Sequence, residues 1–338
     1  MLELLNTKIF DNERNILNAD LFVNNLKHTF KAFKFNTKIT YEVYRNITIY
    51  HITWNDDKSY KDILELKKEI ALALGVSTNE FEIEKEKDNE VKIKVLNMKR
   101  STLSLKELLE ESKYKDNNNN IPLGLSVEDK VIYFNIEKDK NLLVTGVTGI
   151  GKTNLFNNII LNILLNRDNT KIIILDSQSI NYNTYSNLCE VVNEEQEIIN
   201  KIKSIRHIFE DKVKNNDQSR IVVFIDEIYE IIKNDISVKD DINYLLEVGS
   251  TMNIHIIMST DSVLDDDINY LFDKDDISKL SFYLTTRGEY NKFLDNYIDE
   301  SLGRDGIYVS TNSTLTRISI PLLEDNEIER VVKYLEDK

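Results

Sequence analysis

The first third of the chain carries hydrophobic patterns of two kinds. Apolar and polar residues alternate along 36–55 and again along 81–97, and both stretches are rich in β-branched and aromatic side chains. Such alternation predicts strands with one buried face. Between them, residues 59–75 repeat apolar side chains every three or four positions and end at Gly75, which predicts an amphipathic helix with its stop signal. Residues 104–112 predict a further helix.

The rest of the chain shows short, almost wholly apolar segments separated by helix-forming stretches. These segments are 141–146, 171–176, 220–227, 253–260 and 279–286. Strands that are apolar on both faces and alternate with helices are typical of a parallel sheet covered on both sides. The pattern therefore predicts an α/β fold, followed by a hairpin over 305–320 and an amphipathic helix over 324–338.

A run of four asparagines before Ile121 and Pro122 separates the two patterns. Polar, low-complexity stretches of this kind are typical of solvated linkers. We therefore divide the chain into four parts. They are an N-terminal arm or short helix at 1–20, a small α/β domain at 21–115, a linker at 116–125 and a larger α/β domain at 126–338.

Composition restricts the class of protein rather than the reaction. A formal net charge of −15 argues against a protein whose whole surface coats nucleic acid, although a few basic groups can still line a channel. The single cysteine, Cys189, permits no internal disulfide, which favours a reducing compartment. No apolar run reaches the roughly 20 residues that a membrane helix needs, and the first residues do not resemble a signal peptide. We expect a cytoplasmic protein with no membrane insertion of its own.

The sequence GVTGIGKTN predicts a phosphate-binding loop. It fits the pattern G-x-x-x-x-G-K-[ST], with an apolar strand before it and a helix-forming run after it. Glycine lets backbone N–H groups turn toward phosphate oxygens, and the following helix adds its positive N-terminal end. A chance match in a glycine-containing turn is the alternative, and the flanking strand and helix argue against it. The candidate ATP-binding residues are Gly146, Val147, Thr148, Gly149, Ile150, Gly151, Lys152, Thr153 and Asn154.

Two of these residues have chemical roles that the motif itself suggests. In such loops the lysine bridges the β- and γ-phosphates, and the hydroxyl of the next residue binds Mg²⁺. We therefore assign these roles to Lys152 and Thr153, with ATP and Mg²⁺ as the ligands.

A second candidate group follows the apolar stretch IVVFIDE, which ends in Asp226 and Glu227. Sheets of this kind bind ligands at the carboxyl ends of their strands, where these carboxylates fall. We expect Asp226 to hold Mg²⁺ through water and Glu227 to orient and deprotonate the attacking water. Thr260, which ends the next apolar stretch, is a candidate sensor of the γ-phosphate. Solvated caps on strand ends are the alternative for all three residues.

The order of these motifs resembles that of the FtsK/SpoIIIE family of DNA translocases. NLLVTGVTGIGKTN, IIILD, IVVFIDE, IHIIMST and LGRDGIYV follow one another as the family's motif series does. Asn154 and His255 also stand where the family typically has them, and the small domain looks like the one that precedes the motor. The resemblance covers about residues 22–338.

This resemblance implies a RecA-like P-loop NTPase motor. It further implies a homo-oligomer in the form of a hexameric ring, which binds ATP between subunits and pulls double-stranded DNA through its centre without sequence specificity. Family members serve chromosome segregation, plasmid conjugation or specialised protein export. We expect a short member without a winged-helix domain or membrane region, of the sort found on plasmids, phages or other mobile elements.

Several basic positions of the family pattern carry other residues here. The stretch 247–253 lacks the family's basic group, and Asp261 and Ser262 stand where the family has glutamine and arginine. An arginine supplied by the neighbouring subunit can be worth about 10³–10⁵ in rate. The candidates for this trans-acting arginine are Arg287 and Arg304, each with a solvated surface charge as the alternative.

Few residues suggest themselves as DNA contacts. The basic candidates for phosphate contact, which would give salt-dependent binding, are Lys99, Arg100, Arg206 and His207. We interpret Tyr182 and Tyr185 as packing residues, with the lining of a pore as the alternative.

The function that follows is an ATP-driven DNA translocase, an enzyme that couples ATP hydrolysis to movement of double-stranded DNA in plasmid or mobile-element transfer or segregation. Two alternatives stay open. A coupling or secretion ATPase acting on a protein complex would suit the acidic stretch 261–279, and a degenerate ATP-binding switch would suit the missing basic groups.

Overall fold

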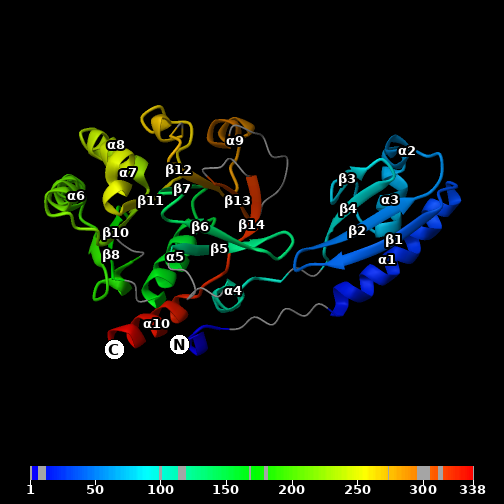
Figure 1. The fold of residues 1–338 in the computed structure, drawn as a ribbon, viewed down its shortest axis with the longest axis horizontal. Coiled ribbons are helices and arrows are strands. Elements are labelled where there is room, and N and C mark those ends of the chain that lie inside the picture. Colours follow the sequence, from blue (N-terminus) through cyan, green and yellow to red (C-terminus); the bar gives the residue numbers. More distant parts are fainter. Residues whose placement is uncertain are drawn as a thin grey trace. The chain divides into compact units, whose positions relative to one another are not determined.

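The computed structural model describes residues 2–6, 13–98, 101–112, 119–166, 169–178, 182–272, 274–294, 305–310 and 315–337. The chain forms two compact units, and Figure 1 labels most of their helices and strands. The smaller unit takes in Lys8–Thr102 with Val127–Lys130. The larger takes in Met1–Thr7, Leu103–Ser126 and Val131–Lys338.

The smaller unit is a four-stranded antiparallel sheet packed against helices. Its strands are β1 (Thr37–Val43), β2 (Ile47–Trp54), β3 (Phe81–Lys87) and β4 (Glu90–Leu96), in the order β1-β2-β4-β3. The strands predicted within 36–55 and 81–97 are confirmed as two hairpins. The predicted helix over 59–75 is confirmed with a break at Leu66, which separates α2 (Tyr60–Glu65) from α3 (Lys67–Leu74).

Helix α1 (Glu13–Ala32) crosses the boundary predicted at residue 20. It contributes Ala19, Val23, Leu26 and Phe30 to the core of the smaller unit. These positions are three or four residues apart, so they form one continuous apolar stripe. The boundary predicted at residue 20 is therefore corrected, because it falls inside a helix that packs as a whole. Residues Leu2–Leu4 form a separate 3₁₀ turn, η1.

The boundary predicted at residue 115 is also corrected. The main segment of the smaller unit ends at Thr102, and helix α4 (Leu105–Ser112), which was predicted as part of the small domain, belongs to the larger unit. Its buried side chains Leu105 and Leu109 lie in the same core as residues of the large sheet. The helix was predicted correctly, but the partner that buries it lies later in the sequence.

The larger unit is built on a ten-stranded sheet of order β6-β5-β14-β13-β12-β7-β11-β10-β8-β9. The run from β12 to β9 is parallel, and the pairs from β12 through β13, β14 and β5 to β6 are antiparallel. The predicted α/β fold with a parallel sheet is thus confirmed. The strands are β5 (Asn120–Ser126), β6 (Val131–Asn135), β7 (Asn141–Thr145), β8 (Thr170–Asp176), β9 (Glu190–Val192), β10 (Arg220–Asp226), β11 (Ile254–Thr260), β12 (Ile277–Ser281), β13 (Asp305–Val309) and β14 (Leu315–Ser319).

Strand β5 occupies most of the segment predicted as a linker at 116–125. It pairs with β6 and β14, and it buries Ile121, Leu123 and Leu125. A register shift between Pro122 and Gly124 accommodates the proline, which has no N–H to donate to a neighbouring strand. The linker is therefore corrected to a strand from Asn120 onward, and 116–118 lie outside the described residues.

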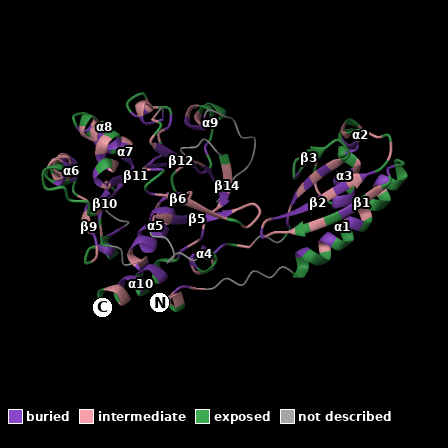
Figure 2. Cartoon of the chain, in the orientation of Figure 1, coloured by how far each residue is buried: buried purple, intermediate pink, exposed green. Residues whose placement is uncertain are grey.

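Helices cover both faces of the large sheet. Besides α4, the bounds are α5 (Lys152–Asn166), α6 (Glu195–Asn215), α7 (Ile228–Asn234), α8 (Val238–Val248), α9 (Arg287–Leu294) and α10 (Asp325–Glu336). Residues of α6, α7, α8 and α9 belong to one core, and residues of α4, α5 and α10 belong to the other. The central strands β7 and β11 are buried at every position, and Figure 2 shows β11 in the colour of buried residues. Within the described ranges, no helix is both long and apolar enough to cross a bilayer.

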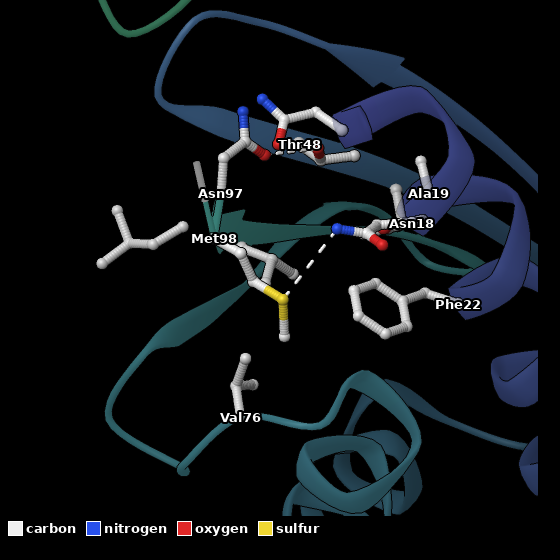
Figure 3. A pocket seen from close by; sticks show the side chains of 11 residues that line it. Asn18, Ala19, Phe22, Thr48, Val76, Asn97 and Met98 are labelled. Carbon is white, nitrogen blue, oxygen red and sulfur yellow. Dashed lines mark hydrogen bonds between the residues drawn. The ribbon is translucent and has the colours of Figure 1, made fainter. Parts of the chain in front are cut away.

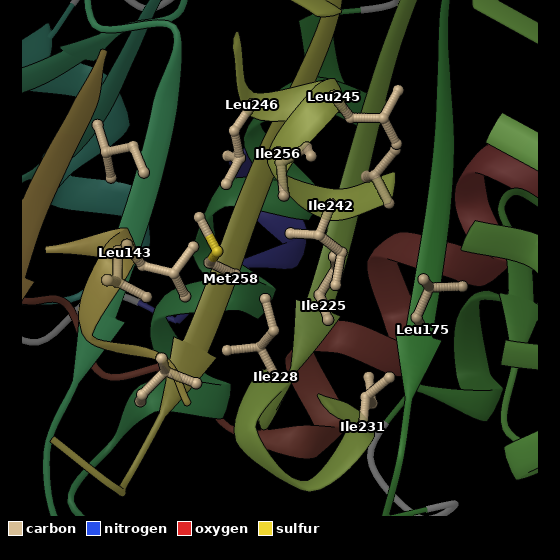
Figure 4. Packing of buried hydrophobic residues seen from close by; sticks show 14 of the residues in the cluster. Leu143, Leu175, Ile225, Ile228, Ile231, Ile242, Leu245, Leu246, Ile256 and Met258 are labelled. Atoms are coloured by element: carbon tan, nitrogen blue, oxygen red, sulfur yellow. The ribbon is translucent and has the colours of Figure 1, made fainter. Parts of the chain in front are cut away.

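Strand β10 shows why helices cover both faces of the sheet. Its side chains alternate, so that Val223 and Ile225 enter one core while Val222 and Phe224 enter the other. Figure 4 shows Ile225 on the first of these faces, in the same cluster as residues of α7 and α8. A strand that is apolar at every position can bury both faces only between two layers of helices. This arrangement leaves the carboxyl ends of the strands as the place for polar side chains.

Candidate functional site

The predicted phosphate-binding loop lies between β7 and α5, at the carboxyl end of the parallel strands. Gly146 has φ +153° and Gly149 has φ +78°, values that residues with a side chain rarely adopt. A Cβ on Gly146 would also lie 2.7 Å from the Cβ of Phe282, whereas a Cβ on Gly149 would meet nothing within 4 Å. The loop is therefore packed tightly at its first glycine and open at Gly149.

Lys152 begins α5 and is held by two protein oxygens. Its Nζ donates to the carbonyl oxygen of Gly146 at 2.8 Å and lies 3.0 Å from Oε1 of Glu227. The two side chains of this ion pair are only 6% and 7% exposed. The lysine and the glutamate that two separate motifs assigned to one site thus meet in space, although they lie far apart along the chain.

Glu227 has a left-handed backbone conformation, and its N–H is hydrogen-bonded to the hydroxyl of Ser259. Its φ of 55° and ψ of 63° are left-handed, which is uncommon for a residue other than glycine. Its N–H donates to Oγ of Ser259 at 2.9 Å, and that hydroxyl donates to Oδ1 of Asp226 at 2.6 Å. Ser259 therefore fixes both members of the acidic pair. The sequence prediction missed this residue, because a single serine within an apolar strand carries no signal of its own.

Asp226 is buried beside a second carboxylate. Strands β10 and β8 pair in register so that Asp226 lies opposite Asp176, and the two residues are 3% and 1% exposed. Burial raises the pKa of Asp226, and the nearby Asp176 adds to this effect, although the hydroxyl of Ser259 opposes it. Two carboxylates brought together with little water favour a positive charge between or beside them.

Tyr182 contacts the first residue of the acidic pair. Its hydroxyl donates to Oδ2 of Asp226 at 3.3 Å. The structure confirms that Tyr182 and Tyr185 are buried packing residues, at 0% and 1% exposure. It also gives Tyr182 a place at the site that no sequence motif indicated, because isolated tyrosines are common in this chain.

Glu227 has the environment of a general base. Burial raises its pKa, while the charge of Lys152 works against that rise. A carboxylate with a raised pKa takes a proton from water more readily than an ordinary one. Its second oxygen, Oε2, accepts the backbone N–H of Asp261 at 3.0 Å, so both oxygens are fixed in orientation.

Thr260 and Asp261 lie at the end of β11 and are hydrogen-bonded to residues in or next to the phosphate-binding loop. The backbone oxygen of Thr260 accepts the hydroxyl of Thr145 at 2.9 Å, and its own Oγ1 accepts the N–H of Ser262 at 3.2 Å. The carboxylate of Asp261 accepts the hydroxyl of Thr148, in the phosphate-binding loop, at 3.1 Å. The structure thus brings the predicted sensor close to the loop but engages its hydroxyl in a turn, and it adds Asp261 as a direct contact.

The side chain of Asn154 has protein partners on both of its polar atoms. Its Nδ2 donates to the carbonyl oxygen of Pro321 at 2.7 Å, and its Oδ1 accepts the N–H of Leu323 at 3.0 Å. The side chain therefore ties α5 to the segment that leads into α10, which fits a role in positioning the helix. His255 is likewise internal, with Nδ1 2.9 Å from the carbonyl oxygen of Lys140 and a pKa that burial lowers to about 4.

The structure describes only some of the candidate arginines and candidate DNA contacts. Arg287 is exposed at the start of α9, and Arg304 lies outside the described residues. Of the candidate DNA contacts, Arg206 binds Asp241 at 2.8 Å and stacks on the ring of Tyr244, so its charge serves the packing of α6 on α8. Lys99 and Arg100 also lie outside the described residues.

The residues of the site fit Mg²⁺ and a nucleotide phosphate. Thr153, Asp226 and Asp176 supply hydroxyl and carboxylate oxygens, the hard ligands that Mg²⁺ takes directly or through water. Lys152 supplies a positive charge at a helix N-terminus, where phosphate binds favourably. In the described part of the chain no cluster of three or more histidine, cysteine or acidic side chains forms a metal site by itself. The phosphates would therefore complete the coordination of the metal.

A cavity in the smaller unit offers no comparable site. It has a volume of about 20 Å³ and lies beside Phe22, Val76 and Met98 (Figure 3). Asn18 Nδ2 donates weakly to the sulfur of Met98 at 3.9 Å across it. A volume of this size holds about one water molecule, so this cavity cannot take a nucleotide.

Comparison with protein families and relatives places these features in context. The sequence model of the FtsK/SpoIIIE family matches residues 104–281, which include the phosphate-binding loop and the acidic pair. The protein named DNA translocase FtsK from Bacillus cereus is 26% identical over 361 residues, covering 94% of this chain and 45% of that protein. Its namesake from Listeria monocytogenes is 25% identical over 371 residues, covering 97% and 49%. The chain thus spans about half the length of these relatives.

Solved structures share the fold at low sequence identity. The pCW3 conjugation coupling protein TcpA, in a monomer form with ATPγS, superimposes with a TM-score of 0.60 at 12% identity, over 94% of this chain and 99% of that chain. The cytoplasmic domain of the type VII secretion ATPase EccC from Thermomonospora curvata gives a TM-score of 0.59 at 12% identity, over 69% and 34%. Both likenesses support the RecA-like P-loop ATPase fold.

Proposed function

Because this chain belongs to the FtsK/SpoIIIE family, we propose that it hydrolyses ATP to move double-stranded DNA through a homo-oligomeric ring. The observation that carries the proposal is the meeting of Lys152 with Glu227 at 3.0 Å, which brings together the chain segments that carry Thr153 and Asp226. These are the groups that phosphate binding, metal binding and activation of water require. The proposed location is the cytoplasm, where ATP is supplied.

The ion pair suggests how binding and hydrolysis are coupled. Glu227 forms an ion pair with Lys152 in this structure. While the pair is closed, Lys152 is not free to bind phosphate and Glu227 is not free to orient water. Phosphate oxygens that bind Lys152 would replace Glu227 as the partner of the ammonium group. The released glutamate carboxylate would then orient the attacking water. Mg²⁺, held by Thr153 and through water by Asp226, would neutralise the charge that develops on the phosphates. Arg287 or Arg304 of a neighbouring subunit is the proposed trans-acting arginine.

Stimulation by DNA tests the proposed substrate. We expect the full chain to hydrolyse ATP faster with duplex DNA, and we expect the stimulation to fall as salt rises, because phosphate contacts release bound counterions. Lys99 and Arg100 are the proposed contacts, so the K99A/R100A double variant should lose most of the stimulation while keeping its basal rate. Hydrolysis that is indifferent to duplex DNA at low salt would rule out the translocase.

A coupling or secretion ATPase is the second candidate, and one observation favours it. The segment that follows β11 exposes Asp261, Asp266 and Asp267 on the larger unit. Such a surface repels DNA and suits a basic protein partner. In that case hydrolysis would ignore DNA and respond to the protein partner instead.

Substitution of Asp261 tests the geometry of the phosphate-binding loop. Its carboxylate contacts Thr148 of the loop and would face a bound triphosphate with a like charge. We expect Asp261→Asn to bind ATP roughly 5-fold more tightly, the size of effect that relief of a like-charge contact gives near a protein surface. The measurement is a titration with fluorescent ATP in Mg²⁺.

Asp266→Asn is the matched control for this substitution, because Asp266 lies in the same acidic segment with its side chain 96% exposed. Its affinity for ATP should equal that of the wild type. Equal gains from both substitutions would show a general charge effect and would contradict the specific placement of Asp261.

A further inference from the structure

The hydroxyl of Tyr182 contacts one of the side chains proposed to hold the metal ion. It donates to Oδ2 of Asp226 at 3.3 Å. The side chain is fully buried, so this hydrogen bond is a fixed part of the folded site. Neither the phosphate-binding motif nor the acidic pair accounts for a phenol in this position.

We propose that the Tyr182 hydroxyl is a plug that competes with Mg²⁺ and its bound water for the carboxylate of Asp226. The proposal rests on the assignment of Asp226 to the metal, which is part of the proposed function. It adds a residue that controls when the metal binds. The nucleotide phosphates and the metal then bind together, because the metal alone must displace a buried hydrogen bond.

The charges around Asp226 support the competition. Ser259 donates to Oδ1 at 2.6 Å and Tyr182 donates to Oδ2, so both oxygens of the carboxylate already receive a hydroxyl hydrogen. A donated proton and a metal-bound water compete for the same lone pairs of the carboxylate. Removal of the phenol hydroxyl should therefore make Asp226 more available.

Tyr185 provides a matched control in the same turn. Both tyrosines flank or belong to the 3₁₀ turn η2 (Asn183–Tyr185), and both are buried. The hydroxyl of Tyr185 donates to Oδ1 of Asn157 at 3.1 Å, away from the proposed metal ligands. Tyr185→Phe removes a buried hydroxyl of the same kind without touching Thr153 or Asp226.

The first experiment measures the Mg²⁺ requirement of nucleotide binding in Tyr182→Phe. Fluorescent ATPγS is held at a fixed concentration with the full chain, and Mg²⁺ is titrated in. We expect the half-saturating Mg²⁺ concentration to fall about 3- to 10-fold, the range that loss of one competing hydrogen bond gives. Binding of the nucleotide in EDTA should stay unchanged, and Tyr185→Phe should match the wild type in both measurements.

A second experiment needs no nucleotide. Mn²⁺ is titrated into each protein and the free ion is counted by electron paramagnetic resonance. Tyr182→Phe should bind Mn²⁺ about 3- to 10-fold more tightly than the wild type or Tyr185→Phe. An unchanged or weaker affinity for Mn²⁺ in Tyr182→Phe would overturn the proposal, because the Tyr182 hydroxyl would then have no effect on metal binding or would assist it. A wild type that binds no ATPγS refutes the proposed function instead, and the Mn²⁺ titration still decides the role of Tyr182.

Discussion

Replacement of Lys152 with alanine is expected to abolish nucleotide binding. The lysine ammonium lies 2.8 Å from the carbonyl oxygen of Gly146 in the loop, and without it the phosphates would meet an uncompensated Glu227. Loss of one partner of a buried, hydrogen-bonded charge pair costs about 2–5 kcal/mol, which lowers affinity by on the order of 10²-fold or more. A titration with fluorescent ATP in Mg²⁺ measures the change.

Folding must be separated from binding in this experiment, because Lys152→Ala leaves the buried carboxylate of Glu227 without its partner. Breaking such a pair can cost about 3–5 kcal/mol of stability. The Lys152→Ala/Glu227→Gln double variant removes both charges, so it should recover stability and still fail to bind ATP. Lys212→Ala is a second control, since Lys212 is 3% exposed and its Nζ donates to the carbonyl oxygen of Ser219 at 2.6 Å. Normal ATP affinity in Lys152→Ala would disprove the assigned role.

Replacement of Glu227 with glutamine is expected to separate binding from hydrolysis. Glutamine cannot accept a proton from water, so the rate should fall by about 10²–10⁴, the usual contribution of a general base. Binding of ATP should persist or become tighter, because the neutral amide no longer competes with phosphate for Lys152. Single-turnover hydrolysis measures the first effect and equilibrium titration the second.

Glu327→Gln is the matched control for loss of a buried carboxylate. Glu327 lies in α10, is 2% exposed and accepts the N–H groups of Asn6 at 2.7 Å and Glu324 at 2.9 Å. Its substitution should lower stability without a change in the rate per folded molecule. If Glu227→Gln hydrolysed ATP at the wild-type rate, another residue would have to orient the water.

The alternative of an ATP-binding switch gives a different expectation for the same pair of proteins. A switch with little turnover would show tight ATP binding in the wild type and almost no hydrolysis, so Glu227→Gln would change neither quantity strongly. A translocase would show a large difference in rate between the wild type and Glu227→Gln. The comparison therefore distinguishes a motor from a switch before any partner is identified.

The sequence by itself determined the features that depend on neighbouring residues. The glycines and the Lys152–Thr153 pair specify the loop locally, because backbone freedom and a helix start are encoded within a few positions. The wholly apolar stretch before Asp226 predicted a buried strand, and the end of that strand marked where polar groups must lie. Alternation along 36–55 and 81–97 likewise predicted the hairpins of the smaller unit.

Tertiary structure alone decided the contacts that join distant segments. The hydrogen bond from Tyr182 to Asp226, and the hydroxyl of Ser259 on the acidic pair, depend on the order of strands in the sheet. Strand β5 and the full length of α1 were not predicted either, since their burial depends on partners far along the chain. Local sequence restricts the conformation of a segment, but hydrogen bonds between segments exist only after the chain has packed.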